Sequence, residues 1–402
     1  MVLSLRDARS SIFLTLCIMG IFAILSSTMS KNPVLKPFAT SLQTPEGFWM
    51  GFVASASTIP GIIVSLPAAS ISDIIGRRKV LLISAVVFAS APFFYLLISM
   101  WWQLIIVRFY HGFATAIFVP VTEASIAELY PSKCGERISL FSSATAVGRG
   151  VAPFLGGYML FITDYSFNTL YLAVGIAGVT TFLTTLLFLV ERKRIQAQFN
   201  RSEKTVDRML HGWKTIAGNP SILAASFIQA IQYYVFGAVE FFLVGYLNDV
   251  VELDAFQIGI VMGSQIVAVI LAKPIMGRLS DQVGRRTPII AGSIIGGVFL
   301  FAIPFTTQFT FLLFLSVVYG LGFAMATSST SALVSELAPK NLTGTAMGFL
   351  CMTRDVGQTI GPLIIGMVVA TNFGYQGAFP TLTVSLLISA LIFAILAFAK
   401  SK

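Results

Sequence analysis

Charged residues are scarce in this chain. Asp, Glu, Lys and Arg make up 11% of its 402 residues, whereas a soluble domain has about 25%. Hydrophobic residues make up 56%, and the mean hydropathy is +0.86. A soluble fold of this length has too little interior to hide so much apolar surface. The composition therefore excludes a soluble protein and predicts that most of the chain lies in lipid.

Histidine and cysteine are also rare, at 2 and 3 residues. Cys17, Cys134 and Cys351 are odd in number and lack the spacing of metal ligands, so we expect neither a disulfide nor a zinc site. The histidines do not pair with Cys or Asp at ligand spacing, and no nucleophile constellation is visible. A phosphate-binding loop is absent too. These absences argue against an enzyme and predict no cofactor and no metal.

The excess of basic residues, which gives a net charge of +9, is explained by the membrane topology of the chain. Of the 26 Lys and Arg residues, 20 fall in the N-terminus and in loops on the side where two arginine-rich loops lie. Membrane proteins concentrate Lys and Arg in their cytoplasmic loops. The asymmetry accounts for the charge without nucleic acid. It also predicts a plasma-membrane protein with both termini in the cytoplasm.

Twelve apolar runs are long enough to cross a bilayer, which takes roughly 20 residues. They lie near residues 10–30, 48–71, 79–99, 102–126, 137–162, 168–190, 219–247, 256–277, 287–306, 309–334, 343–370 and 376–399. The first run has no cleavage site after it, so we expect it to be retained as a span. The fold class predicted is an all-α integral membrane protein.

The second half of the chain repeats the first. The loop SDIIGRRK at 72–79 returns as SDQVGRRT at 280–287, 208 residues later, and AELYP at 127–131 returns as SELAP at 335–339. With one residue of shift, Gly148, Pro153 and Gly157 match Gly357, Pro362 and Gly366. Repeats of this kind are typical of secondary transporters built from two related bundles. We predict six-helix bundles at 1–190 and 219–402, joined by a cytoplasmic linker at 191–218.

These motifs resemble those of the major facilitator superfamily over essentially the whole chain. The family's loop after the second helix has the pattern Gly-x-x-x-Asp-Arg-x-Gly-Arg-Arg. The first copy here departs from it at Ala69 and Ile74, and the second copy departs at Gln282. The resemblance extends to the family's fourth and fifth helices through Arg108, Gly112 and the Gly/Pro-rich run at 148–157, where Ala152 replaces a family glycine.

The resemblance implies that the loop motif is a conformational latch on the cytoplasmic side. Asp73 would lie beside the positive end of the eleventh helix, where a carboxylate is favoured. A glycine permits the tight turn of each loop. We expect Arg77 to pair with Glu128, and Arg285 with Glu336. The alternative is that the arginines only anchor the loops. The full set of latch residues is Asp73, Gly76, Arg77, Arg78, Glu128, Asp281, Gly284, Arg285, Arg286 and Glu336.

Ionisable residues inside the spans indicate the transport path, because a charge at the bilayer centre costs about 2.5–3.5 kcal/mol on insertion scales. Carboxylates that face a cavity are the candidate proton carriers, in the order Glu123, Glu240 and Asp355. An alternative for Arg354 and Asp355 is an ion pair with another helix. The predicted substrate and proton path comprises Arg108, His111, Thr115, Glu123, Arg149, Tyr233, Glu240, Arg354 and Asp355.

The fourth span has a polar face. Arg108, Thr115 and Thr122 recur at intervals of seven, which places them on one side of a helix. His111 and Glu123 flank that line. Arg108 and Glu123 are about 22 Å apart along the axis, too far to pair directly. We predict that this face lines a central cavity, with Arg108 orienting substrate or aiding proton coupling; the alternative is a structural bridge.

Helix bends are predicted at glycine and proline clusters, either for close packing or for a special role in antiport. The residues are Gly148, Pro153, Gly157, Gly361 and Pro362. The tenth span carries the neutral hydroxyls of residues 327–331. Together with Tyr233, Tyr234 and Gln265 they favour a modestly polar, neutral or cationic organic substrate.

Taken together, the sequence predicts a monomeric carrier that works by alternating access. The resemblance is to drug/proton antiporters and implies proton-coupled export of small organic or drug-like compounds. Proton-coupled uptake or uniport of a nutrient is the main alternative. A membrane enzyme, or a receptor that binds without transport, is a weaker one.

Overall fold

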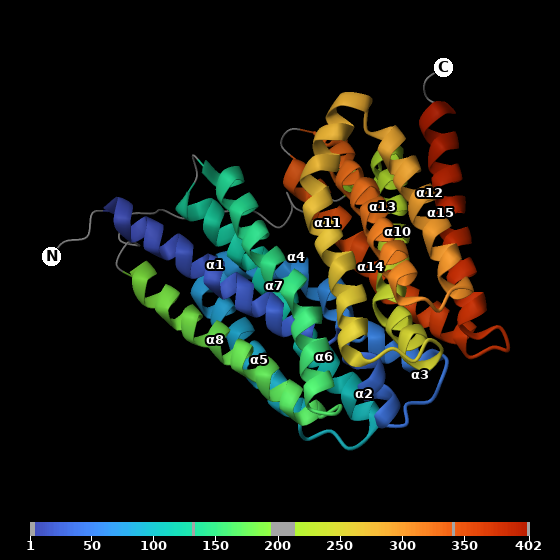
Figure 1. Ribbon diagram of the computed structural model, residues 1–402. Helices are drawn as coiled ribbons and strands as arrows, with labels where there is room; N and C mark the ends of the chain where they lie inside the picture. Colours follow the sequence, from blue (N-terminus) through green and yellow to red (C-terminus); the bar gives the residue numbers. More distant parts are fainter. Residues whose placement is uncertain (1–4, 131–132, 194–213, 340–341, 400–402) are drawn as a thin grey trace. The chain divides into compact units, whose positions relative to one another are not determined.

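The computed structural model describes residues 5–130, 133–193, 214–339 and 342–399, and within these ranges the regular structure is helical (Figure 1). The helices of the first half are α1 (Leu5–Met29), α2 (Leu35–Ser41), α3 (Phe48–Ser55), α4 (Ile59–Ile75), α5 (Arg77–Tyr95), α6 (Trp101–Leu129), α7 (Cys134–Ile162) and α8 (Phe167–Lys193). Those of the second half are α10 (Pro220–Asp249), α11 (Ala255–Val283), α12 (Arg286–Ala302), the 3₁₀ turn η3 (Ile303–Phe305), α13 (Phe309–Leu337), α14 (Thr343–Val369) and α15 (Gly374–Ala399).

The helices account for twelve membrane spans. Ten of the described helices are long and apolar enough to cross a bilayer, and the bent pair α3 and α4 makes an eleventh span. The twelfth is α14, whose 27 residues give a length of about 40 Å at 1.5 Å per residue. It carries Arg354 and Asp355 near its middle. The all-α, twelve-span fold predicted from the sequence is confirmed.

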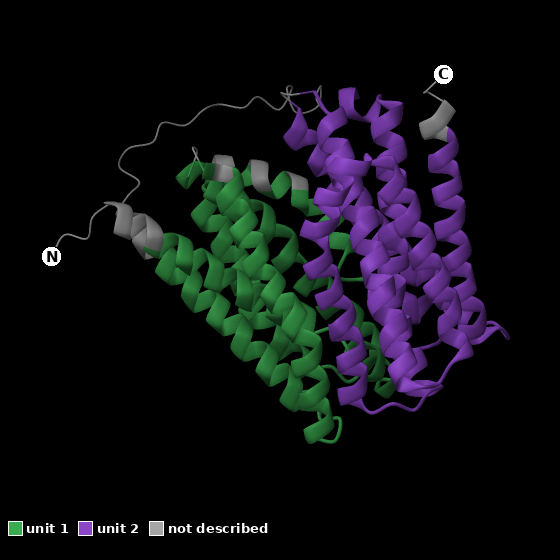
Figure 2. Ribbon diagram, turned by 45° about the horizontal axis from the view of Figure 1, so that its top comes forward, with its two compact units in different colours: residues 1–43, 56–202 green, residues 44–55, 203–402 purple. Residues whose placement is uncertain are grey.

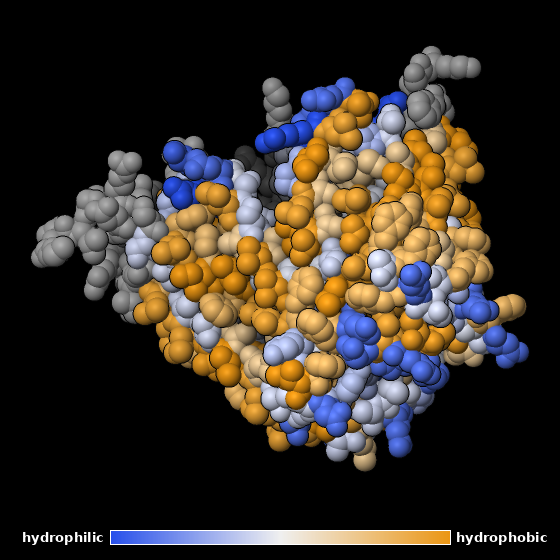
Figure 3. Space-filling view, viewed as in Figure 1, coloured by the Kyte–Doolittle hydropathy of each residue, from blue (hydrophilic) through white to orange (hydrophobic). Residues whose placement is uncertain are grey.

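Large apolar side chains cover the outward faces of the helices. On α8, Ile176 and Leu187 are 69% and 60% exposed, and on α15 Leu391 and Ile395 are 61% and 59% exposed. Figure 3 shows these hydrophobic flanks, with hydrophilic residues gathered toward the helix ends. Soluble proteins rarely expose apolar surface on this scale. The exposed faces therefore match a hydrocarbon environment.

Contacts between helices divide the chain into two compact units (Figure 2). Unit 1 comprises residues 1–43 and 56–202, and unit 2 comprises residues 44–55 and 203–402. Most of the predicted linker, residues 194–213, lies outside the described residues. The domain boundaries given above therefore stay a prediction.

The two units repeat the same packing pattern. In unit 1, α1 packs against α7 and α8, α4 against α6, and α5 against α6 and α8. In unit 2, α10 packs against α14 and α15, α11 against α13, and α12 against α13 and α15. Each pair in the first unit thus has its counterpart in the second. The internal repeat seen in the sequence is a repeat of structure.

The second span is broken, which the sequence analysis did not predict. α3 and α4 meet at a bend of 40° around residues 56–58. Pro60 lies two residues into α4 and has no N–H to donate to the carbonyl of residue 56. In the repeat, Ala268 stands 208 residues later, and α11 runs through as one helix. The break in the second span thus coincides with a proline that the second copy of the repeat lacks.

The short helix α3 is docked on α14 within unit 2. A Cβ on Gly51 would collide with the backbone of Pro362 and Leu363, so the two helices touch backbone to backbone. The Ser55 hydroxyl donates to the Thr359 carbonyl at 2.6 Å. Small residues permit such close contacts between membrane helices. α3 is therefore held by α14 rather than by the rest of its own span.

We expect Pro60→Ala to extend helical structure across residues 56–60, because alanine restores the missing N–H. In hydrogen–deuterium exchange, the amides of residues 57–59 should exchange at least about tenfold more slowly than in the wild type, equivalent to ~1.4 kcal/mol. As a control, Pro67→Ala, inside the unbroken part of α4, should change exchange only near residues 63–67. Unchanged exchange of the amides at 57–59 would show that packing of α3, not Pro60, sets the break.

Candidate functional site

The two arginine-rich loops have the same backbone conformation. Gly76 separates α4 from α5 with φ of +99°, and Gly284 separates α11 from α12 with φ of +85°. L-residues avoid this left-handed region, whereas glycine enters it freely. The tight turn predicted at each loop is confirmed. It places Arg77 and Arg285 at equivalent positions beside the next helix.

Each arginine forms the ion pair that the sequence predicted. In unit 1, Arg77 Nε donates to Glu128 Oε2 at 2.7 Å. In unit 2, Arg285 donates to Glu336 Oε1 through Nε at 2.9 Å and through Nη2 at 2.6 Å. The hydrogen bond from Arg285 to Glu336 raises the pKa of the guanidinium further above its usual range. Both pairs clamp a loop to the end of a neighbouring helix.

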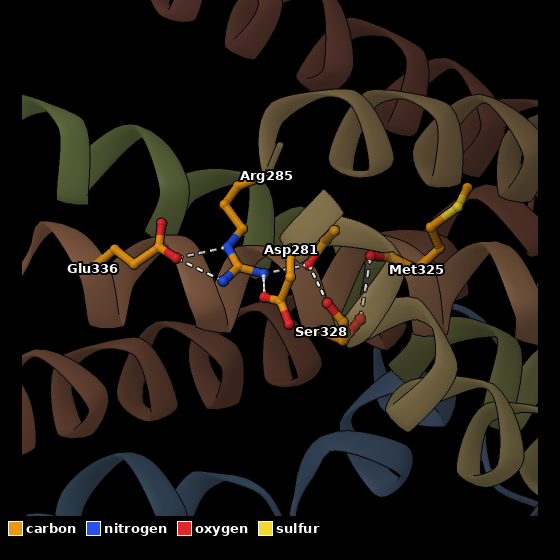
Figure 4. Close-up of polar contacts among 7 residues, drawn as sticks. Asp281, Arg285, Met325, Ser328 and Glu336 are labelled. Carbon is orange, nitrogen blue, oxygen red and sulfur yellow. Dashed lines mark hydrogen bonds and ion pairs between the residues drawn. The ribbon is translucent and has the colours of Figure 1, made fainter. Parts of the chain in front are cut away.

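The second pair belongs to a larger cluster, shown in Figure 4. The Arg285 side chain lies between Glu336 and Asp281, with which it also forms an ion pair, and Nη1 donates to Ser280 Oγ at 2.6 Å. Arg78 is half-buried and Arg286 is exposed. The side chain of Asp73 lies outside the described residues. The latch role of this motif therefore stays a prediction, although its ion pairs are confirmed.

A double-mutant cycle on Arg285→Ala and Glu336→Ala should give a coupling free energy of about 0.5–1 kcal/mol, because a partly exposed ion pair contributes little. The Glu128 side chain is 33% exposed, against 55% for Glu336. The Arg77–Glu128 cycle should therefore give the larger value. The measurement is chemical unfolding of the purified protein, with Arg278→Ala at an exposed arginine as the control. A smaller coupling for Arg77–Glu128 would contradict this reading.

The polar face of the fourth span, α6, is turned into unit 1. Arg108 is only 2% exposed, and its Nη2 donates to Ser57 Oγ at 2.6 Å, at the break between α3 and α4. Thr115 donates to Ser27 on α1 at 3.1 Å. Gly112 lies between them, so close to the backbone at Ser57 that a Cβ would collide. This face thus joins α6 to α1 and to the start of α4.

An aromatic group that the sequence analysis missed surrounds the buried histidine. Tyr95 from α5 stacks on Tyr171 from α8 with centroids 4.3 Å apart, and its hydroxyl lies 3.5 Å from His111 Nδ1. The other ring nitrogen of His111 is buried and has no hydrogen-bond partner. Neither tyrosine stands in a recognisable motif, so only the fold shows that they meet.

Two other predicted path residues of unit 1 are accessible. Glu123 lies on α6 and is half-buried, while Arg149 on α7 is exposed. An exposed arginine this far inside a span must face water or a polar surface in the membrane, because acyl chains disfavour it.

The path residues of unit 2 fall into two groups. On α14, Arg354 Nε donates to Asp355 Oδ1 at 2.9 Å, and its guanidinium lies 5.6 Å from the centre of the Tyr233 ring on α10. On α10, Glu240 accepts from Gln358 Nε2 of α14 at 3.2 Å. Arg354 and Asp355 thus form an ion pair with each other on α14, whereas the alternative given above was an ion pair with another helix. The contact of Arg354 with α10 is a cation–π contact.

The glycines of the bend motif are packing positions. A Cβ on Gly148 would collide with the α1 backbone at Ile21, and one on Gly361 would collide with the α10 backbone at Tyr234. α7 and α14 each continue as one helix through Pro153 and Pro362. Gly157 is buried. Close helix packing is therefore confirmed, while bending and a role in antiport stay predictions.

One protein-family model matches this chain over nearly its whole length. The model of the Major Facilitator Superfamily matches residues 11–251 and again residues 225–402. The chain belongs to the major facilitator superfamily. Its members are transporters rather than enzymes, and this one is a multi-pass membrane protein that carries small molecules.

The chain is similar to several transporters. The chain is 26% identical to the multidrug resistance protein MdtG of Enterobacter lignolyticus, covering 91% of this chain and 87% of that protein. It is 22% identical to the uncharacterized MFS-type transporter MJ1560 of Methanocaldococcus jannaschii, covering 84% and 86%.

Solved structures show the same fold. A bacterial homologue of the human lysosomal transporter Spinster matches with a TM-score of 0.78 at 15% identity, covering 96% of this chain and 95% of that one. The nucleoside transporter NupG matches with a TM-score of 0.75 at 15% identity, covering 95% and 98%. At this identity the likeness shows the fold and not the substrate.

Proposed function

We propose that this superfamily member is a secondary active exporter of small organic compounds, driven by exchange for protons. The observation that carries the proposal is the set of ionisable side chains inside the spans: Glu123 and Arg108 on α6, Glu240 on α10, and Arg354 with Asp355 on α14. Charges at such depth are costly and mark ion or substrate pathways by default. The similarity to MdtG, whose name describes multidrug resistance, supports export.

Different roles follow from the surroundings of each residue. Arg108 is buried and held by Ser57, so it positions the polar face of α6. Glu123 and Glu240 are the proposed proton carriers. Asp355 is engaged by Arg354 and serves mainly to hold that guanidinium against Tyr233. The other path residues, His111, Thr115 and Arg149, are proposed to line the route.

The latch and the membrane placement complete the proposal. Asp73, together with the loop at Gly76, closes the cytoplasmic side in one state and releases it in the other. Residues 1–190 and 219–402 act as the two moving bundles, with 191–218 as the linker between them. The protein functions as a monomer in the plasma membrane with both termini in the cytoplasm.

Purified protein in proteoliposomes tests the proposal. An imposed pH gradient should drive accumulation of a fluorescent organic substrate such as ethidium against its own gradient, and adding ethidium should move protons in the opposite direction. Protons that move in the same direction as the substrate would indicate symport and favour uptake. Transport that ignores the pH gradient would remove proton coupling from the proposal.

A further inference from the structure

Among the buried polar atoms of unit 2 that have no hydrogen-bond partner in the described residues, four lie where α11 and α13 meet. They are both polar side-chain atoms of Gln265 on α11, and the hydroxyls of Ser316 and Tyr319 on α13. Gln265 is 0% exposed, and the other two are 1% exposed. Buried polar groups are nearly always satisfied by protein, water or a ligand. Three such side chains on one interface therefore need a partner.

The internal repeat shows what fills the same place in unit 1. Ser57, Arg108 and His111 stand 208 residues before Gln265, Ser316 and Tyr319. The backbones correspond as well: a Cβ on Gly112 would meet Ser57 and Pro60, and a Cβ on Gly320 would meet Gln265 and Ala268. In unit 1, the Arg108 guanidinium donates to Ser57. In unit 2, the serine at 316 supplies no guanidinium.

The two units also differ in the sign of the ionisable residue that lies at the depth of these polar groups. Glu240 on α10 stands 208 residues after the neutral Asn32, and α10 packs against α13, the helix that carries Tyr319. Glu240, Gln265 and Tyr319 are each nine or ten residues from the helix end at loops 250–254 and 306–308. At 1.5 Å per residue they lie at one depth, about 15 Å from those ends. Unit 1 therefore carries its own cation, the Arg108 guanidinium, in this region, whereas unit 2 carries the Glu240 carboxylate.

An aromatic wall adjoins the polar groups. Phe323 lies one turn from Tyr319, with ring centroids 6.4 Å apart, and it stacks on Phe236 at 4.6 Å. Phe236 is one turn from Glu240 on α10. Hydrogen-bond acceptors, a carboxylate and aromatic rings are together the chemistry that holds an ammonium group bearing an apolar substituent.

We propose that Gln265, Ser316, Tyr319 and Glu240 bind the cationic end of an organic ammonium substrate, in the place that the Arg108 guanidinium takes in unit 1. The three N–H groups of the ammonium are shared among the Gln265 carbonyl oxygen, the two hydroxyls and the carboxylate, and the apolar part of the substrate lies along Phe323 and Phe236. This inference rests on the proposed transport of small organic compounds and names their class.

The test is equilibrium binding to the purified full chain, which needs no pH gradient. The probes are 2-phenylethylammonium and its neutral counterpart 2-phenylethanol, measured by calorimetry and by the shift in melting temperature. The ammonium should bind at least about tenfold more tightly than the alcohol, a difference of ~1.4 kcal/mol. Equal binding of the two probes overturns the proposal. Stabilisation by sodium chloride but not by choline chloride, without ammonium binding, would indicate a metal-cation site and also overturn it.

Three variants separate this site from general effects on the fold. Ser316→Arg supplies the guanidinium that unit 1 has, so it should raise the melting temperature and remove ammonium binding. Gln265→Leu replaces an unsatisfied amide, so it should keep or raise the melting temperature and weaken ammonium binding at least about tenfold. Glu240→Gln should weaken binding of the ammonium and leave that of the alcohol unchanged.

Gln232→Leu is the matched control. Gln232 is an equally buried glutamine on α10, but it already donates to Ser293 Oγ at 2.8 Å. Its loss should lower the melting temperature and leave ammonium binding unchanged. If Ser316→Arg and Gln265→Leu both bind the ammonium as tightly as the wild type, the polar groups hold only water, and the proposal is wrong. Proton-coupled export of other compounds would still stand, because proteoliposome transport tests it separately.

Discussion

Gly361→Val is expected to abolish folded protein. Gly357 and Gly361 lie one turn apart on α14, and each faces the backbone of α10, at Ala230 and Tyr234. A single Cβ at Gly361 would already lie 2.8 Å from the Tyr234 carbonyl carbon, and helix backbones do not move aside as a flexible side chain does. Overpacking typically costs 1–3 kcal/mol, and more where no neighbour can relax. We therefore expect a cost above about 3 kcal/mol.

The measurement is the yield of monodisperse protein in size-exclusion chromatography, followed by thermal unfolding. Gly344→Val on the same helix is the control, because no atom lies within 4 Å of a Cβ built there. That variant should purify and melt like the wild type. Comparable yields for Gly361→Val would mean that α10 and α14 do not pack backbone to backbone.

The parts of the fold that are local in sequence could be predicted. Apolar runs of sufficient length gave the spans, and the loops around Gly76 and Gly284 follow from glycine's access to positive φ. The pairs Arg77–Glu128 and Arg285–Glu336 were predictable because both members recur at the same offset of 208 residues. A repeat supplies the long-range information that a single pattern lacks.

The same repeat held signals that were not used. The first half has Pro60 where the second half has Ala268, and this difference marks the broken second span. The first half has Arg108 where the second half has Ser316, and this difference marks the unsatisfied polar groups of unit 2. Both are departures from symmetry, and they matter because the surroundings stay alike while one residue changes. Comparing the halves residue by residue would have found them.

Contacts without a counterpart in the repeat could not be predicted. The stacking of Tyr95 on Tyr171 joins two helices whose sequences carry no shared motif. The docking of α3 on α14 depends on glycines that could face any small-residue surface. Which helix faces which is settled by packing in three dimensions, and apolar spans of similar hydropathy do not encode it locally.

Glu123→Gln is expected to uncouple transport from the pH gradient. The amide keeps the shape of the side chain and, like the protonated carboxyl, both donates and accepts hydrogen bonds, but it cannot release or take up a proton. If Glu123 is a proton carrier, gradient-driven accumulation in proteoliposomes should fall at least about tenfold, equivalent to ~1.4 kcal/mol. Exchange of labelled for unlabelled substrate at equal concentrations should persist, because exchange requires binding and reorientation but no proton movement.

The two assays together distinguish the carboxylates. Glu240→Gln should weaken exchange as well as accumulation, because this residue is also proposed to bind the substrate's ammonium group. Glu136→Gln is the control, since Glu136 lies in the first turn of α7, outside the apolar part of the span, and pairs with Lys133 at 3.7 Å. It should behave as the wild type in both assays.

If Glu123→Gln and Glu240→Gln both accumulate substrate as the wild type does, then either another group carries the proton or transport is not coupled to protons. A loss of exchange in Glu123→Gln would instead make Glu123 a substrate ligand, since proton carriage alone leaves binding intact.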